Sequence, residues 1–145
     1  MQRRTLLQVV GAAAVGLAGC SGSDPTPAET DTPTPTTGPS EVLVEMTDSL
    51  KFVPETVEIA VGDTVVWETV GSVAHSVTAY EADLPADADY WASGGFDDEA
   101  SARQAYPDGS VGAGETYTYT FETAGEYPYF CIPHESGMVG TVVVG

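Results

Sequence analysis

Four side chains that can bind a soft metal ion lie in two separate parts of the sequence. Cys131, His134 and Met138 lie close together near the carboxyl end, with a proline and glycines in the same segment to stiffen and bend it. His75 lies far upstream, at the start of a predicted strand. One thiolate, two imidazoles and a weak thioether form the ligand set of a blue copper electron-transfer site. These residue types therefore predict one type 1 copper ion bound by His75, Cys131, His134 and Met138.

The mixed ligand set favours copper over zinc and electron transfer over catalysis. The thiolate is soft enough for Cu(I), and the imidazoles suit Cu(II), so the set tolerates both oxidation states. Structural zinc sites use four cysteine or histidine ligands, for which a thioether is a poor substitute. The carboxylates show no paired-acid catalytic signature and are interpreted as a solvated surface. We therefore predict a one-electron carrier cycling between Cu(I) and Cu(II), and not an enzyme.

Other interpretations of the same residues stay open at this point. Cys131 taken alone is most often a small buried core residue, and Met138 could simply fill the core. Cys131 with His134 or His75 could also form the nucleophile–base pair of a thiol enzyme. A third alternative is a copper-delivery module without a redox partner, although such carriers more often use sets rich in methionine and histidine.

The segments around these residues resemble a known family. The resemblance covers about residues 41–145 and is carried by four motifs: Phe52-Val53-Pro54, Gly62 to Trp67, Val73 to Val77, and Tyr129 to Gly140. In these motifs the chain resembles the cupredoxins, and most closely the halocyanins, which are plastocyanin-like blue copper proteins of haloarchaea. The resemblance implies an eight-stranded Greek-key sandwich with copper bound at one end.

The same resemblance implies a role for each ligand and shows two departures. His75, Cys131 and His134 match the equatorial ligands of the family, and Met138 matches the axial one. Three residues separate His134 from Met138, whereas plastocyanins usually have four there and amicyanins two. Ser76 follows the first histidine, where many cupredoxins have asparagine. Hydrogen bonds near the sulfur tune the reduction potential of the copper. The reduction potentials typical of the family are therefore not expected to apply to this chain.

The elements that must position these ligands are predicted to be strands. Six segments with turn signals between them show the alternation of side chains that is typical of strands. These segments are 42–45, 57–61, 63–68, 75–80, 116–121 and 127–131, and a further strand at 141–144 closes the chain. Short strands of this kind predict an all-β fold, an antiparallel sandwich, which the resemblance implies to be a Greek-key β-sandwich of about eight strands. The stretch 81–113 is less regular and is predicted to be an insertion. Its part 97–105 is expected to form a short helix capped by Asp97 or Asp98.

The amino-terminal segment is predicted to be a targeting signal. Arg3 and Arg4 precede an apolar run from Val9 to Gly19, which resembles a twin-arginine (Tat) export signal and is too short to span a membrane. The run ends in Leu-Ala-Gly-Cys20, which resembles a lipobox. Residues 1–20 are therefore expected to be a lipoprotein signal whose cleavage leaves Cys20 as the lipid-carrying first residue; an ordinary cleaved signal is the alternative. A linker rich in threonine, proline and serine (21–40) follows, and the cupredoxin domain is predicted to occupy 41–145. The expected location is the outer face of the cell membrane, with a lipid anchor.

The strongly negative charge excludes nucleic acids as partners and indicates an environment of high salt. All 22 acidic residues lie after Cys20, where Lys51 and Arg103 are the only fixed positive charges, so that part has a formal net charge of −20. Nucleic-acid binding is excluded, because phosphate neutralisation needs lysine and arginine. Self-repulsion of this size destabilises a compact domain unless salt screens it, which indicates a halophilic protein. An acidic surface that docks a basic partner is the alternative.

The partners of the predicted carrier are redox proteins that donate and accept single electrons. A membrane cytochrome complex, a terminal oxidase or a copper reductase of nitrogen respiration would fit, and the domain is expected to be monomeric. Electrons are expected to pass through the edge of His134, the ligand nearest the loop surface. Val73, Ala74, Pro133 and Val139 are expected to form an apolar collar around that exit.

Overall fold

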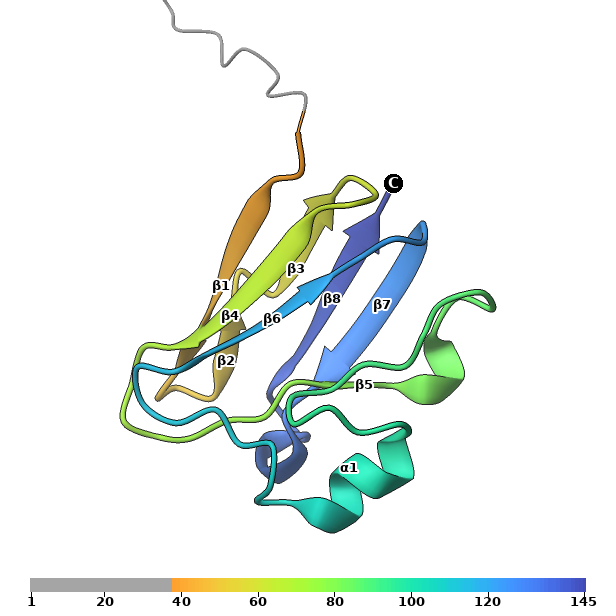
Figure 1. The fold of residues 1–145 in the computed structure, drawn as a ribbon. Helices are drawn as coiled ribbons and strands as arrows, with labels where there is room; N and C mark the ends of the chain where they lie inside the picture. The colour runs from red at the N-terminus through yellow and green to blue at the C-terminus, as the bar shows by residue number, and fades with distance from the viewer. Residues whose placement is uncertain (1–37) are drawn as a thin grey trace, which may run out of the picture. The chain divides into compact units, whose positions relative to one another are not determined.

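The computed structural model describes residues 38–145, which form two four-stranded sheets packed against each other (Figure 1). The strands in chain order are β1 (Glu41–Thr47), β2 (Lys51–Val53), β3 (Thr56–Ile59), β4 (Thr64–Thr69), β5 (Thr78–Ala79), β6 (Thr116–Thr120), β7 (Gly125–Phe130) and β8 (Val139–Val144). Three short helices complete the fold: the 3-10 helices η1 (Glu81–Asp83) and η2 (Ile132–His134), and α1 (Glu99–Ala105). The predicted signal segment, the lipidation of Cys20 and most of the predicted linker lie outside the described residues.

The two sheets have mixed pairing. One sheet has the order β2-β1-β4-β6 and the other β3-β8-β7-β5. The pairs β1–β4 and β3–β8 are parallel, and the remaining four pairs are antiparallel. The predicted all-β sandwich of about eight strands is confirmed, but the expectation of antiparallel pairing is wrong for these two pairs. The period of two along a strand specifies which face is buried and carries no information on the direction of its neighbour.

Alternating side chains of both sheets form one aromatic core. Trp67 of β4 is fully buried and stacks on Trp91, with 5.3 Å between the ring centroids. Tyr129 of β7 meets the Trp67 ring edge-on at 5.4 Å. Trp91 belongs to the irregular stretch 81–113, which therefore contributes to the core and is not only a surface insertion. A rigid core of this kind holds the ends of β4 and β7 in place for the site beyond them.

The segment after β4 differs from the expected strand over 75–80. Only Thr78 and Ala79 pair with β7, whereas His75 forms an isolated bridge with Val111 of the insertion. That bridge has two backbone hydrogen bonds, of 3.1 Å and 2.7 Å. The backbone of His75 is thus fixed by the insertion and not by the sheet. The predicted short helix is confirmed as α1, whose amino end is capped by Asp98 through a 2.6 Å bond from the Ser101 N–H.

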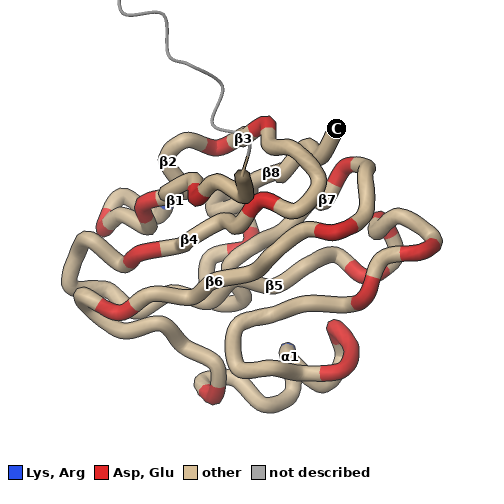
Figure 2. Tube along the Cα trace, turned by 45° about the horizontal axis from the view of Figure 1, so that its top comes forward, with Lys and Arg blue, Asp and Glu red and all other residues tan. Residues whose placement is uncertain are grey.

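The sandwich has two distinct ends. Figure 1 shows the start of β1 and the carboxyl terminus at one end, and the β7–β8 connection with η2 and α1 at the other. Asp and Glu residues are distributed over both sheets and the loops (Figure 2). Within residues 38–145, none of the helices has the length and apolar character needed to cross a membrane.

Candidate metal centre

The β7–β8 connection, residues 131–138, carries three of the four predicted ligands and is called the ligand loop below. Cys131 leaves β7, η2 then turns the chain, and Met138 leads into β8. The Cys131 N–H donates to the Met138 carbonyl at 3.0 Å, which closes the base of the loop. The N–H groups of Gly137 and Met138 both donate to the His134 carbonyl, at 3.0 Å and 2.9 Å. The loop backbone is therefore a closed turn that fixes the spacing of its ligands.

Three donor atoms converge at the mouth of this loop. The Cys131 Sγ lies 3.4 Å from the His134 Nδ1 and 3.9 Å from the His75 Nδ1. One donor atom from each of the three residues lies within 4.8 Å of the other two. For comparison, a trigonal metal with zinc-like bonds of about 2.0 Å to nitrogen and about 2.3 Å to sulfur needs roughly 3.7 Å between nitrogen and sulfur. The three side chains thus fit a small metal ion without rearrangement.

His75 is buried in a state suited to metal binding. Burial lowers the pKa of its imidazole, and the neighbouring His134 lowers it further. The Thr47 backbone and the Asp48 carboxylate oppose this change, although the His75 Nε2 makes no hydrogen bond of good geometry in the described structure. A neutral imidazole has the free lone pair that a metal requires. His75 therefore presents its Nδ1, 3.9 Å from the Cys131 Sγ, as a metal-binding atom.

Cys131 is also fully buried, which argues against its interpretation as the nucleophile of a thiol enzyme. Burial raises the pKa of its thiol, while the Ser76 N–H, 3.3 Å from Sγ, opposes the shift. A catalytic cysteine needs a lowered pKa and access for its substrate. Cys131 has neither, so the geometry disfavours the thiol-enzyme alternative. A metal ion that displaces the thiol proton fits the site better.

Ser76 joins the His75 segment to the ligand loop. Its backbone N–H points at the Cys131 Sγ, its Oγ lies 3.9 Å from the same sulfur, and the Ile132 N–H donates to that Oγ at 2.8 Å. In the sequence, Ser76 stands out only as a departure from the family pattern. The signal that could have identified its role is chemical: like asparagine, serine offers a side-chain oxygen that accepts a backbone N–H.

The remaining two predicted ligands differ in exposure. His134 is partly exposed, while Met138 is fully buried in the same core cluster as Cys131. Val73 and Val139 are 36% and 38% exposed, and Ala74 and Pro133 are also exposed. The side chains expected to form an apolar collar are therefore at the surface, and His134 is the ligand that solvent or a partner can reach.

Three polar residues around the ligand loop were not predicted to bear on the site. Glu135 follows His134 directly and accepts two hydrogen bonds from Arg103. Lys51 donates to the Gly137 carbonyl from β2. A signal for Lys51 and Arg103 was present in the sequence, because basic residues are very rare in this acidic chain; Glu135, one of many acidic residues, had none.

The comparisons with known proteins point to the same chemistry. Residues 40–145 match the family model of copper-binding proteins of the plastocyanin/azurin family. A plastocyanin of Vicia faba is 32% identical over 108 residues, which cover 72% of this chain and 98% of that protein. A chloroplastic plastocyanin of Tetradesmus obliquus is 39% identical over 97 residues, which cover 66% of this chain and 59% of that relative's length.

Solved structures with a similar fold include a pseudoazurin and an amicyanin mutant. Pseudoazurin from Methylobacterium extorquens is similar with a TM-score of 0.55 and 27% identity, over 72% of this chain and 75% of that one. The Cu(I) form of an amicyanin mutant is similar with a TM-score of 0.53 and 26% identity, over 72% of this chain and 81% of that one.

Proposed function

The chain belongs to the plastocyanin/azurin family of copper-binding proteins, and from this premise we propose that it is a one-electron carrier with His75, Cys131, His134 and Met138 as copper ligands. The observation that carries the proposal is the convergence of the Cys131 Sγ and the two Nδ1 atoms within 3.4 Å and 3.9 Å. Copper supplies a Cu(I)/Cu(II) couple when bound to such a ligand set. The relatives are plastocyanins, which supports a carrier and not an enzyme.

The protein residues hold the site rigidly, bury Cys131 away from water and leave one edge of His134 exposed. The His75 backbone is fixed by its bridge to Val111, and Cys131 leaves a strand whose side chains fill the core. A site held rigid by its fold changes little between oxidation states, which keeps electron transfer fast. His134 is the partly exposed ligand and is therefore the proposed exit for electrons, inside the apolar collar described above.

The test is a visible spectrum of the full-length protein in high salt, with Cu(II) and then a reductant added. We expect an intense blue band that bleaches on reduction and returns on reoxidation. A colourless protein whose Cys131 stays titratable by a thiol reagent would refute the copper proposal and revive the thiol-enzyme alternative. A blue protein that passes its copper to a chelating acceptor faster than it exchanges electrons would support the copper-delivery alternative instead.

Ser76→Ala is expected to lower both the reduction potential and the stability of the metal-free fold. The substitution removes the acceptor of the Ile132 N–H, and an unpaired amide costs about 1–3 kcal/mol. It also removes the hydroxyl near the Cys131 sulfur, and a donor to that sulfur favours the reduced state. Voltammetry and thermal unfolding measure the two effects. Ser136→Ala, at an exposed position of the same loop, is the matched control and should change neither.

The acidic surface supports a finer assignment, a halocyanin-like protein adapted to high salt. With only Lys51 and Arg103 opposing 22 acidic residues after Cys20, repulsion falls when salt screens it. We expect the free energy of unfolding to drop as salt is removed, and more so for metal-free than for copper-loaded protein. Copper at a hundred times its Kd adds about 2.7 kcal/mol to the folded state. Denaturant titrations at several salt concentrations measure this, and equal stability in low and high salt would contradict it.

We further propose lipid anchoring at the outer face of the membrane through Cys20, after a Tat-type signal of residues 1–20 and a linker of residues 21–40. The support is the lipobox-like sequence ending at Cys20, with the paired arginines ahead of it. Because β1 begins at the end of the sandwich opposite the ligand loop, a tether on that side would leave His134 accessible. Cys20→Ala should move the protein from the membrane fraction to the medium; unchanged fractionation would argue against the anchor.

The proposed partners are a redox donor and a redox acceptor that reach a monomeric domain at the His134 edge. A membrane cytochrome complex, an oxidase or a copper reductase fits this role, as expected for a single-electron carrier outside the cell. The alternative use of the acidic surface, docking of a basic partner, predicts that association rates fall steeply with ionic strength.

A further inference from the structure

The basic residues of the folded domain occupy unusual positions. Lys51 and Arg103 are the only lysine and arginine in the sequence after Arg4, and both contact the ligand loop. Each comes from a different element, β2 or α1, and each binds a different residue of the loop. In a domain that contains 19 of the 22 acidic residues of the sequence, cations could neutralise charge at many places. Their shared position beside one eight-residue loop requires another explanation.

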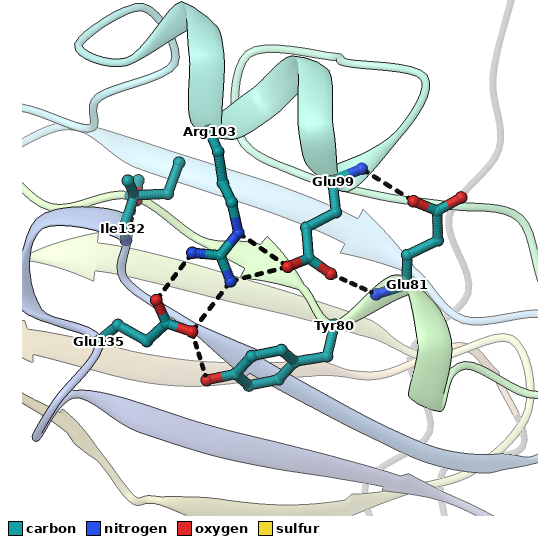
Figure 3. A network of polar contacts seen from close by, with 7 residues as sticks. Tyr80, Glu81, Glu99, Arg103, Ile132 and Glu135 are labelled. Carbon is teal, nitrogen blue, oxygen red and sulfur yellow. Dashed lines mark hydrogen bonds and ion pairs between the residues drawn. The ribbon is translucent and has the colours of Figure 1, made fainter.

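Arg103 contacts Glu135 with a two-pronged geometry (Figure 3). Its Nη1 lies 2.7 Å from one carboxylate oxygen of Glu135 and its Nη2 lies 2.9 Å from the other. The guanidinium is itself held by Glu99, one turn earlier on α1, with its Nε 2.8 Å from the Glu99 Oε1. It also lies 4.2 Å from the centre of the Phe130 ring. Two contacts, with Glu99 and with the Phe130 ring, therefore hold Arg103 in addition to Glu135.

Glu135 is held from a second direction as well. The Tyr80 hydroxyl lies 3.1 Å from the Glu135 Oε1, and the Tyr80 ring packs on Phe130 with 4.3 Å between centroids. The side chains of Arg103 and Glu135 are 36% and 38% exposed. A single ion pair at such exposure contributes little to the free energy of unfolding. Exposed ion pairs restrict the positions of their side chains when the contact is bidentate and belongs to a network, as it does here.

Lys51 contacts the same loop two residues later. Its Nζ donates to the Gly137 carbonyl at 2.7 Å. Glu135 and Gly137 lie in the three-residue spacer between His134 and Met138. The two cations therefore hold both ends of the spacer whose length departs from the usual plastocyanin and amicyanin patterns. These contacts with β2 and α1 add to the backbone hydrogen bonds that already close the loop between His134 and Met138.

We propose that Lys51 and Arg103 are positioning residues that clamp the spacer of the ligand loop and so fix His134 relative to Met138. The inference deepens the proposed copper site and rests on it for its spectroscopic consequences. It also assigns a role to the insertion, because α1 presents Arg103 to the loop. Neither cation touches the metal ligands directly; they act through Glu135 and the Gly137 carbonyl.

The decisive experiment compares Arg103→Gln with Glu135→Gln in the full-length protein. Each breaks the same contact, but the two remove charges of opposite sign. If only long-range electrostatics matter, the reduction potential shifts in opposite directions and the blue band keeps its shape. If the clamp positions the loop, both variants change the blue band in the same way, and the double variant changes it no further.

A second measurement does not depend on copper. In the metal-free protein, hydrogen exchange of the Gly137 and Met138 amides, which bond to the His134 carbonyl, should speed up about tenfold in both variants, as when a hydrogen bond to a charged group is lost. Lys51→Gln should raise the exchange rate at the same two amides. Glu126→Gln, exposed on β7 at the end away from the loop, is the charge-matched control and should leave both amides unchanged.

The outcomes separate the clamp from the copper site. Arg103→Lys keeps the charge but not the two-pronged contact, so it should behave like Arg103→Gln; full native behaviour would overturn the clamp. Unchanged amide exchange with opposite shifts in potential would overturn it too. If the parent protein shows no blue band, the proposed function fails, and the exchange rates still decide whether the cations hold the loop.

Discussion

Replacing Cys131 by serine is expected to abolish the blue absorption completely and to remove most of the affinity for Cu(I). The intense band requires a thiolate bound to copper, and a serine hydroxyl offers neither a soft donor nor an accessible anion at neutral pH. Serine is close to cysteine in size and can accept the Ser76 N–H, so the fold should survive. Visible absorption with Cu(II) and a Cu(I) competition assay are the measurements.

The control for Cys131→Ser is the metal-free fold itself. Circular dichroism and thermal unfolding without copper should differ little from those of the parent, because the core residues around the site are untouched. Retention of the native band by the serine variant would show that the assigned thiolate is not the copper ligand.

His134→Gly is expected to convert the closed site into one that an external ligand completes. Removal of a direct ligand should weaken copper binding more than the 10–100-fold typical for the loss of an outer-shell partner. His134 is partly exposed, so free imidazole can enter from solvent and occupy the vacated position. We expect the native-like band to disappear in the variant and to return as imidazole is added.

His75→Gly is the matched comparison for this rescue. His75 is fully buried and its backbone is bridged to Val111, so imidazole has no open route to the cavity that the substitution leaves. Rescue should therefore be efficient at position 134 and poor at position 75. Equal rescue at both positions would contradict the assignment of His134 as the exposed ligand and, with it, the proposed electron exit.

The convergence of Cys131 and the two histidines could be anticipated because few residues in the sequence can do this chemistry. The described domain contains one cysteine and two histidines, so a metal site had few possible compositions. The three side chains do lie together, and Met138 is buried in the core cluster that also contains Cys131. The small number of basic residues could likewise have drawn attention to Lys51 and Arg103. Charge alone, however, does not specify which carboxylate or carbonyl group a cation contacts.

The sheet topology was less accessible from the sequence. Strands β1, β4 and β6 follow clear alternation, whereas β2 and β5 have only three and two residues and leave almost no periodic signal. The expected strand over 75–80 failed at His75 because its partner is Val111, in a segment without a repeating pattern. Pairing with a remote irregular segment depends on tertiary packing, which local periodicity does not encode.

The two ends of the sandwich also have a practical consequence for bioelectronic use. The carboxyl terminus follows β8, whose six residues extend for about 20 Å between the ligand loop and the opposite end. A domain wired to a gold electrode through a thiol added after Gly145 would point its copper toward the solution. Current would then have to tunnel along the length of a strand, while a soluble redox mediator would meet His134 directly. Wiring through the collar around His134 would reverse that preference.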